Sequence, residues 1–191
     1  MITTTTSIYA PGQDVTLDVA TNDFGGAVNV NGANITLVDA NAIQLGDIDG
    51  GAGATLTVTA LGGQITQTAT QTINVDDAAF NSGAQTTRLQ TAGNTFSGTV
   101  SVTLSRNAYV NASGDLTLGA VRGDNGGTVE NAFTSYGGNI ELTGNVDLAG
   151  ASANSNLTLT ANSGTIIQSG GVITARDVDA VAATSITLDQ A

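Results

Sequence analysis

The chain has 191 residues, enough for one or two domains with a sizeable core. Its formal net charge is −12, because 16 acidic residues outweigh four cations, and it contains no Cys, His or Trp. These values exclude nucleic-acid binding, which needs clustered cations, as well as a disulfide framework or a thiolate metal site.

Strand-like alternation of apolar and polar residues recurs along the whole chain. The alternating segments are rich in β-branched residues, and Gly, Asn, Asp and Ser cluster between them. No stretch has the spacing of an amphipathic helix, so we predict an all-β protein. In chain order the segments are 14–19, 34–38, 42–48, 55–60, 64–68, 72–75, 98–104, 115–121, 139–144, 156–161 and 185–189.

Targeting and membrane segments are not found in the sequence. No apolar run reaches about 18 residues, so we expect no membrane insertion. The first residues, MITTTTSIYAPGQ, lack the basic and apolar regions of a signal peptide. We therefore expect any export signal to lie outside this sequence.

One long pattern occurs twice in the chain. TLDVATNDFGGAVNV (16–30) and RLQTAGNTFSGTVSV (88–102) share the form x-L-x-x-A-x-N-x-F-x-G-x-V-x-V. TLDQA (187–191) matches the opening of a third copy. The internal repeats therefore start near residues 16, 88 and 187.

Further repeats recur at different offsets. IQLGDI (43–48) matches LTLGAV (116–121), and LTVTALGGQITQT (56–68) matches LTLTANSGTIIQS (157–169) at an offset of 101. Offsets that drift favour a solenoid, which gains or loses coils because each coil contacts only its neighbours.

The spacing of strand centres predicts the coil. Centres recur near residues 29, 36 and 44 and again near 101, 109 and 117, which suits three short strands per coil. We predict a right-handed parallel β-helix (β-solenoid) of about eight coils. Residues 1–191 would form a single segment of a longer repeat array. The alternative fold is a pair of immunoglobulin-like sandwiches, for which we would expect a buried Trp and more Pro.

These repeats resemble the filamentous haemagglutinin-like bacterial exoproteins, which are exported by two-partner or autotransporter routes. The resemblance rests on N-x-F-x-G-x-V-x-V at 22–30 and 94–102, on IQLG and LTLG, and on L-T-V/L-T-A-x-x-G-x-I-x-Q. It covers residues 14–191 and implies a right-handed parallel β-helix in the shaft of a surface or secreted adhesin. The export-recognition region of such proteins has no counterpart in this sequence.

Paired carboxylates are the first candidates for chemistry. Asp47/Asp49 and Asp177/Asp179 are spaced to lie on one face of a strand, as the acids of glycan-cleaving β-helices do. A solvated outer face or corner explains them more simply, because it requires only that the charges stay hydrated, and it is our preferred interpretation. Without Lys or His, lyase chemistry has few bases to use. We expect no enzyme, no catalytic residue and no cofactor.

Calcium binding, cell attachment and ice binding are further alternatives. GGAGATLTV (50–58) begins like a calcium-binding nonapeptide but has Thr55 where the Asp ligand belongs. Surface calcium at 46–51, 76–77 or 122–127 is an alternative to plain turns. Arg122, Gly123 and Asp124 spell a tripeptide displayed by integrin ligands, so a recognition turn there is an alternative to a plain Gly-rich turn. Irregular Thr-x-Thr strings are better explained as ordinary outward-facing Thr than as an ice-binding surface.

The sequence thus predicts a structural shaft of a bacterial surface or secreted adhesin, or of an extracellular filament. The expected location is extracellular or at the bacterial cell surface, with a host or neighbouring-cell surface glycan or protein as partner. The alternative is a glycan-binding or glycan-cleaving β-helix. Because TLDQA opens a further coil, we also expect head-to-tail association of the chain with itself.

Overall fold

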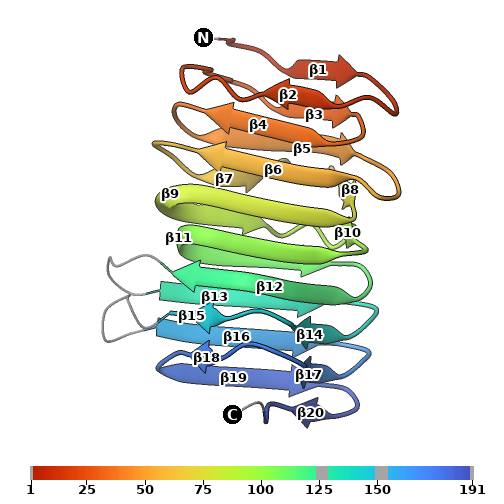
Figure 1. Ribbon diagram of the computed structural model, residues 1–191, viewed down its shortest axis with the longest axis vertical. Coiled ribbons are helices and arrows are strands. Elements are labelled where there is room, and N and C mark those ends of the chain that lie inside the picture. Colours follow the sequence, from red (N-terminus) through yellow and green to blue (C-terminus); the bar gives the residue numbers. More distant parts are fainter. Residues whose placement is uncertain (1, 124–128, 149–154, 190–191) are drawn as a thin grey trace.

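The computed structural model describes residues 2–123, 129–148 and 155–189. This part of the chain contains only strands, turns and bends, and its parallel strands stack as a β-solenoid of about eight turns (Figure 1). The all-β prediction and the β-solenoid are therefore confirmed. The strands are β1 (Thr6–Tyr9), β2 (Val15–Leu17), β3 (Val28–Asn31), β4 (Ile35–Asp39), β5 (Ile43–Asp49), β6 (Thr55–Ala60), β7 (Ile65–Gln67), β8 (Ile73–Val75), β9 (Asp77–Leu89), β10 (Thr95–Phe96), β11 (Thr99–Ala112), β12 (Leu116–Gly123), β13 (Val129–Ser135), β14 (Ile140–Leu142), β15 (Val146–Asp147), β16 (Ser155–Ala161), β17 (Ile166–Gln168), β18 (Ile173–Thr174), β19 (Asp177–Ala182) and β20 (Ile186–Thr187).

The strands stack in three rows, each running along the solenoid. Row 1 contains β2, β4, β6, the starts of β9 and β11, the end of β12, β15 and β18. Row 2 contains the start of β5, β7, the ends of β9 and β11, β13, β16 and β19. Row 3 contains β1, β3, the end of β5, β8, β10, the start of β12, β14, β17 and β20. From β4 onward, each turn therefore visits three rows.

Four strands bend around a corner and belong to two rows. The register of β5 shifts from Leu45, which pairs with β7, to Ile48, which pairs with β8. In β9 the corner is made by Gly83 and Ala84, which both have positive φ. Such irregularities accommodate an extra residue and turn the strand without breaking it.

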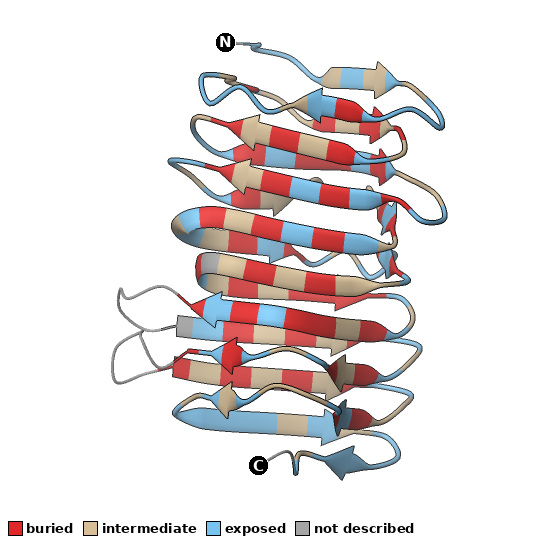
Figure 2. Ribbon diagram, in the orientation of Figure 1, coloured by how far each residue is buried: buried red, intermediate tan, exposed pale blue. Residues whose placement is uncertain are grey.

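Buried residues alternate with more exposed ones along most strands (Figure 2). Along β6 the alternate residues Leu56, Val58 and Ala60 are buried, while the intervening Thr residues are exposed or half-buried. Their row partners in β4 include the buried Ile35 and Leu37. Because the register aligns apolar residues turn after turn, the core is one continuous apolar column.

Neighbouring coils approach closely at glycine turns. A Cβ built on Gly63 would lie 2.5 Å from the backbone N of Ala42, and one on Gly164 would lie 2.6 Å from the carbonyl O of Gly138. Both glycines stand at the same place in the A-x-x-G-x-I-x-Q repeat. The repeat therefore keeps Gly here because one coil packs directly on the backbone of the previous coil.

The last described coil leaves core positions uncovered. Val178 pairs with the buried Leu157, and Ile186 pairs with the buried Ile166, so both continue inward-facing columns. Their side chains are nevertheless 44% and 45% exposed, and β19 and β20 are largely exposed in Figure 2. A further stacked coil would bury both side chains.

Across the described ranges, no helix has the length and apolarity that crossing a membrane requires.

Candidate functional site

The Asn of the N-x-F motif in the long repeat closes a turn. Asn22 Nδ2 donates to the carbonyl of Leu17 at 3.1 Å, and Asn94 Nδ2 donates to the carbonyl of Leu89 at 3.4 Å. Each Asn thus bonds the carbonyl five residues before it. The Phe two residues after each Asn is buried, Phe24 to 6% exposure and Phe96 to 4%. The N-x-F pair therefore shapes a corner and anchors it in the core.

Asn94 also joins three successive coils. Its side chain is completely buried, and its Oδ1 accepts hydrogen bonds from Gln67 Nε2 at 2.6 Å and from the Ile73 N–H at 3.0 Å. Its Nδ2 donates to Gln67 Oε1 at 3.1 Å and to the Asn111 carbonyl at 3.2 Å. A buried amide of this kind is stable only because both of its ends are bonded.

The Gln of the I-x-Q repeat has a comparable role. Gln67 pairs with the buried Leu45 and therefore occupies a core-facing position. Its Nε2 donates to the carbonyl of Gln71 at 2.9 Å, and Gln168 Nε2 donates to the carbonyl of Gly171 at 2.9 Å. Both Gln residues cap the turn that follows their strand, so the shared polar residues of the repeats serve the fold.

Side-chain oxygens on the surface bond the backbone of the next coil. Asp14 Oδ1 accepts from the Asn34 N–H at 3.2 Å and from Asn34 Nδ2 at 2.9 Å, and Asn34 Oδ1 accepts from the Thr55 hydroxyl at 3.0 Å. Asp115 Oδ1 accepts from the Asn139 N–H at 2.7 Å in the same way. These inter-coil ladders satisfy N–H groups at the corners, where the sheet does not.

Asp47 and Asp49 belong to such ladders. Asp49 accepts from Asn31 Nδ2 and Asn74 Nδ2, each at 3.0 Å, and so lies between the coil before and the coil after. Asp47 Oδ1 accepts from the Thr72 N–H at 2.9 Å. Both carboxylates line a shallow hollow of about 370 Å³. Their hydrogen bonds show that this acid pair holds coils together.

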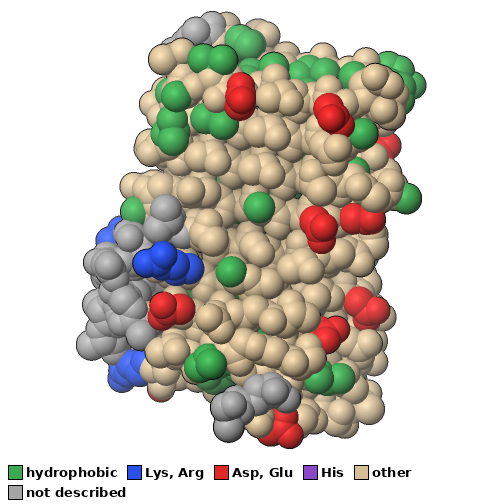
Figure 3. All heavy atoms as spheres, in the orientation of Figure 1, with side chains coloured by type: hydrophobic (Ala, Val, Ile, Leu, Met, Phe, Trp, Pro, Cys, Tyr) green, Lys and Arg blue, Asp and Glu red, His purple; other side chains and the backbone are tan. Residues whose placement is uncertain are grey.

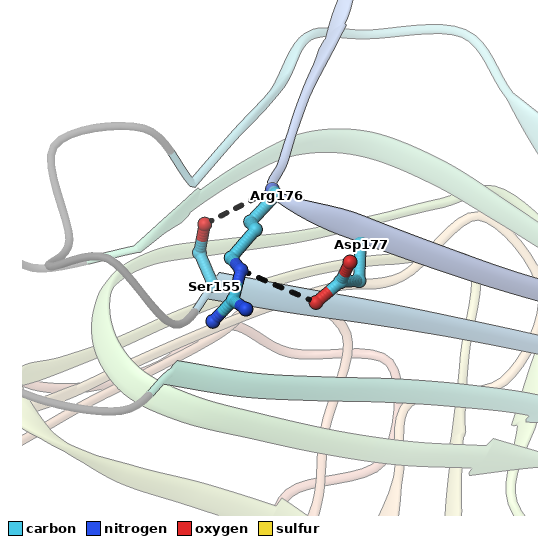
Figure 4. A network of polar contacts seen from close by, with 3 residues as sticks. All are labelled: Ser155, Arg176 and Asp177. Atoms are coloured by element: carbon cyan, nitrogen blue, oxygen red, sulfur yellow. Dashed lines mark hydrogen bonds and ion pairs between the residues drawn. The ribbon is translucent and has the colours of Figure 1, made fainter.

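Asp177 and Asp179 lie on the outer surface of β19 and are both exposed. Figure 4 shows the Arg176 side chain pointing toward Asp177, with 3.6 Å between Arg176 Nε and Asp177 Oδ2. The Arg176 N–H also donates to the Ser155 hydroxyl at 3.2 Å. The side chains of this ion pair are more than half exposed, so it contributes little stability.

The loops at 50–53 and 76–77, near the predicted calcium alternatives, have other bonding partners, and most of the loop at 122–127 lies outside the described residues. Gly51 and Gly53 have positive φ, as turn residues do, and the Gly53 N–H donates to Asp76 Oδ2 at 2.6 Å. The other oxygen of Asp76 accepts from the Ser97 hydroxyl, and Asp77 Oδ1 accepts from the Thr99 N–H at 2.7 Å. In the ranges that the structure describes, no group of three or more His, Cys, Asp or Glu side chains is placed to hold a metal ion.

The predicted recognition turn begins inside a strand. Arg122 and Gly123 are the last two residues of β12, and Gly123 is a buried residue that pairs with Ser105. Arg122 is exposed and lies opposite Asp147 of β15. Asp124 lies outside the described residues, so recognition at this tripeptide stays a prediction.

Sequence reasoning missed a cluster of Arg88, Tyr109 and Glu130 on the outer surface of row 2. Arg88 and Tyr109 pair across neighbouring coils, and the guanidinium carbon lies 4.5 Å from the centre of the tyrosine ring. The Tyr109 hydroxyl donates to Glu130 Oε2 at 3.0 Å. Partial burial and the Glu130 carboxylate raise the pKa of Tyr109 above its usual 10.0, although Arg88 opposes them. The three residues follow one another at intervals of one coil, a signal that reveals the cluster only when the register is known.

Most of the surface on the face shown in Figure 3 is uncharged. Figure 3 shows cationic side chains along one long edge of the face, while acidic side chains are scattered from one end to the other. Between them the face consists mostly of polar uncharged side chains and backbone. A surface of this kind fits the predominance of outward-facing Thr, Asn and Ser.

The continuous core, the three rows and the turn-capping repeats define a β-solenoid repeat protein. A family model described as "Repeats of unknown function (DUF5649)" matches residues 1–31, 32–103 and 137–191, which is most of the chain. The chain belongs to this family. The second match, 32–103, is as long as the step between the two copies of the long repeat, which start at residues 16 and 88. Neither the curated proteins nor the solved structures contain a match.

Proposed function

We propose that the chain is a section of the structural shaft of a bacterial surface or secreted adhesin, or of an extracellular filament, similar to the filamentous haemagglutinin-like exoproteins. Its role is to extend and to present other regions at a distance. The observation that supports this role most is the use of the polar side chains. Asn22, Asn94, Gln67, Gln168 and Asp49 all bond turns or neighbouring coils.

The candidate acids favour this role over glycan cleavage. General acid catalysis needs a carboxyl group placed to reach a substrate. Asp49 instead accepts two amide hydrogen bonds from neighbouring coils, and Asp177 forms an exposed ion pair. A shaft needs residues that join its coils and residues that keep its surface hydrated; the hydrogen bonds of Asp49 supply the first, and the exposed charge of Asp177 supplies the second.

We further propose that the chain associates with itself head to tail. Val178 and Ile186 continue the core columns but stay half exposed, and an added coil would cover them. Fully burying an apolar side chain of this size contributes roughly 1.5–3 kcal/mol, so covering the exposed half of each contributes roughly half as much. A contact between one end and the opposite end is heterologous, so it builds filaments instead of closed dimers.

Sedimentation velocity over a concentration series tests this association. Wild type should form larger species as concentration rises, and Val178→Asp should shift that onset to higher concentration. Val181→Asp is the matched control, because Val181 is on the same strand as Val178 and is also exposed, but it pairs with the outward-facing Thr160 of β16. Monomers at every concentration, or equal effects of the two variants, would refute end-to-end stacking.

A further inference from the structure

Two contacts hold the Arg88 side chain in place. Its guanidinium stacks on the Tyr109 ring, and Nη1 donates to Gln90 Oε1 at 2.7 Å. A guanidinium has five N–H donors, so others remain for a ligand. Because these two contacts already restrict the Arg88 side chain, which otherwise has high rotamer freedom, less side-chain entropy is lost when a ligand binds.

Tyr109 is itself fixed by the next coil. Its hydroxyl donates to Glu130 Oε2 at 3.0 Å, and the Glu130 N–H donates to Asn107 Oδ1 at 2.9 Å. Arg88, Tyr109 and Glu130 therefore form a chain of contacts across three successive coils. The acid at its end orients the ring, and the ring orients the cation.

A surface hollow of about 460 Å³ opens at Arg88, on the coil before Tyr109. Its volume lies in the range of small-molecule sites. Thr70 in its wall has φ of 72°, as Gly171 has 67° at the matching place of the other I-x-Q repeat, so the turn after Gln67 shapes this side of the hollow. The hollow is lined by Gln67, Ala69, Thr70, Arg88, Gln90 and Thr91.

We propose that this hollow binds a carboxylate-bearing sugar residue. The planar guanidinium of Arg88 matches a carboxylate with two parallel hydrogen bonds. The Thr hydroxyls and the Gln90 amide suit the hydroxyl groups of a sugar ring. In a chain with a net charge of −12, an anionic ligand needs such a fixed cation to bind at all. The site goes beyond the shaft function and does not depend on it.

The test uses trigalacturonate as the probe and amide chemical shifts of the full chain as the measurement. Titration should shift the amide signals of residues 67–70 and 88–91 in a saturable way. Galactotriose, which lacks carboxylates, and inorganic sulfate should each bind at least about tenfold more weakly. Absence of saturable shifts with trigalacturonate, or equal binding of either comparison ligand, would overturn the proposal.

Three variants locate the site. Arg88→Gln should weaken trigalacturonate binding about tenfold or more, and Arg88→Lys should also weaken it because a point charge cannot form the paired bonds. Arg176→Gln removes the same charge elsewhere and should leave binding unchanged. Wild-type affinity in Arg88→Gln, or an equal loss in Arg176→Gln, would show that the hollow is not the site. Amide spectra of each free variant confirm that the fold is retained.

Discussion

The side-chain amides of Gln67 and Asn94 bond each other at both ends, across two neighbouring coils. Gln67 Nε2 donates to Asn94 Oδ1 at 2.6 Å, and Asn94 Nδ2 donates back to Gln67 Oε1 at 3.1 Å. Each of the two residues belongs to a different sequence repeat, one in I-x-Q and the other in N-x-F. The two repeats are therefore linked by a direct polar contact inside the solenoid.

Replacing Asn94 by Ala should lower the stability of the fold substantially. The change removes the acceptor of the buried Ile73 N–H and one of the partners of each Gln67 amide atom, at a cost of about 1–3 kcal/mol. Urea unfolding followed by circular dichroism measures the change. Asn22→Ala is the matched control, because Asn22 has the same place in the repeat but is only half-buried. If both variants lose equal stability, the buried amide pair has no special role.

The two acid pairs should respond differently to substitution. Asp49→Ala removes the acceptor of two inter-coil hydrogen bonds, so the unfolding free energy should fall by about 0.5–1.5 kcal/mol. Asp177→Ala and Asp179→Ala should leave it within about 0.5 kcal/mol, as expected of exposed positions. Both measurements come from urea unfolding, with glycan cleavage assayed in parallel. Detectable cleavage that disappears with either exposed Asp would contradict the structural role of the chain.

Titration of Tyr109 should occur above the usual pH for tyrosine. Desolvation is the largest cause of its raised pKa and Glu130 is the next, so Glu130→Gln should lower the pKa part of the way. A raised folded-state pKa contributes stability that is complete below the unfolded value and is lost as pH rises through the folded value. The measurement is ultraviolet difference spectroscopy of wild type against Tyr109→Phe. An unchanged titration in Glu130→Gln would show that the carboxylate does not act on the ring.

Much of the fold could be predicted from the sequence, because the alternation of apolar and polar residues and the internal repeats are both visible in it. Short strands of Thr, Val, Ile and Leu were predicted close to their bounds, and 55–60 matches β6 at both ends. The strands β9 and β13 were missed. Their inward positions include small or polar residues such as Ala78, Ser82 and Asn131, which leave no clear apolar alternation. Their strand conformation depends on coils stacked on either side.

The relation between repeats and rows could not be predicted. Leu17 and Leu89 are the matching residues of the first two copies of the long repeat, and they lie in row 1 and row 2. The third copy starts at Thr187, the last residue of β20, in row 3. The repeats at 43–48 and 56–68 also reappear one row further on. Each copy thus advances around the solenoid by one row. Because the three rows offer similar environments, successive copies need not be separated by a whole number of turns.

The candidate sites were harder to predict than the fold. The Asp47/Asp49 pair was found from spacing alone, but spacing does not reveal that Asn31 and Asn74 bond Asp49. Arg88, Tyr109 and Glu130 are far apart in sequence and come together only through the register of row 2. Long-range register is a property of the stack, and no local pattern encodes it.

A shaft whose length is set by the number of coils should tolerate removal of one whole coil. Leu37 and Val58 are row partners, so deleting residues 37–57 joins Thr36 to Val58 and keeps every row in register. Deleting residues 37–47 removes about half a coil and displaces the following core residues from their columns. This half-coil deletion is the control.

Thermal unfolding of the two deletion variants, followed by circular dichroism, is the most direct measurement. The whole-coil variant should keep a strand spectrum and a cooperative transition, and solution X-ray scattering should show a particle shorter by about 4.8 Å. The half-coil variant should unfold or melt without cooperativity. Unfolding of both variants alike would contradict a modular shaft.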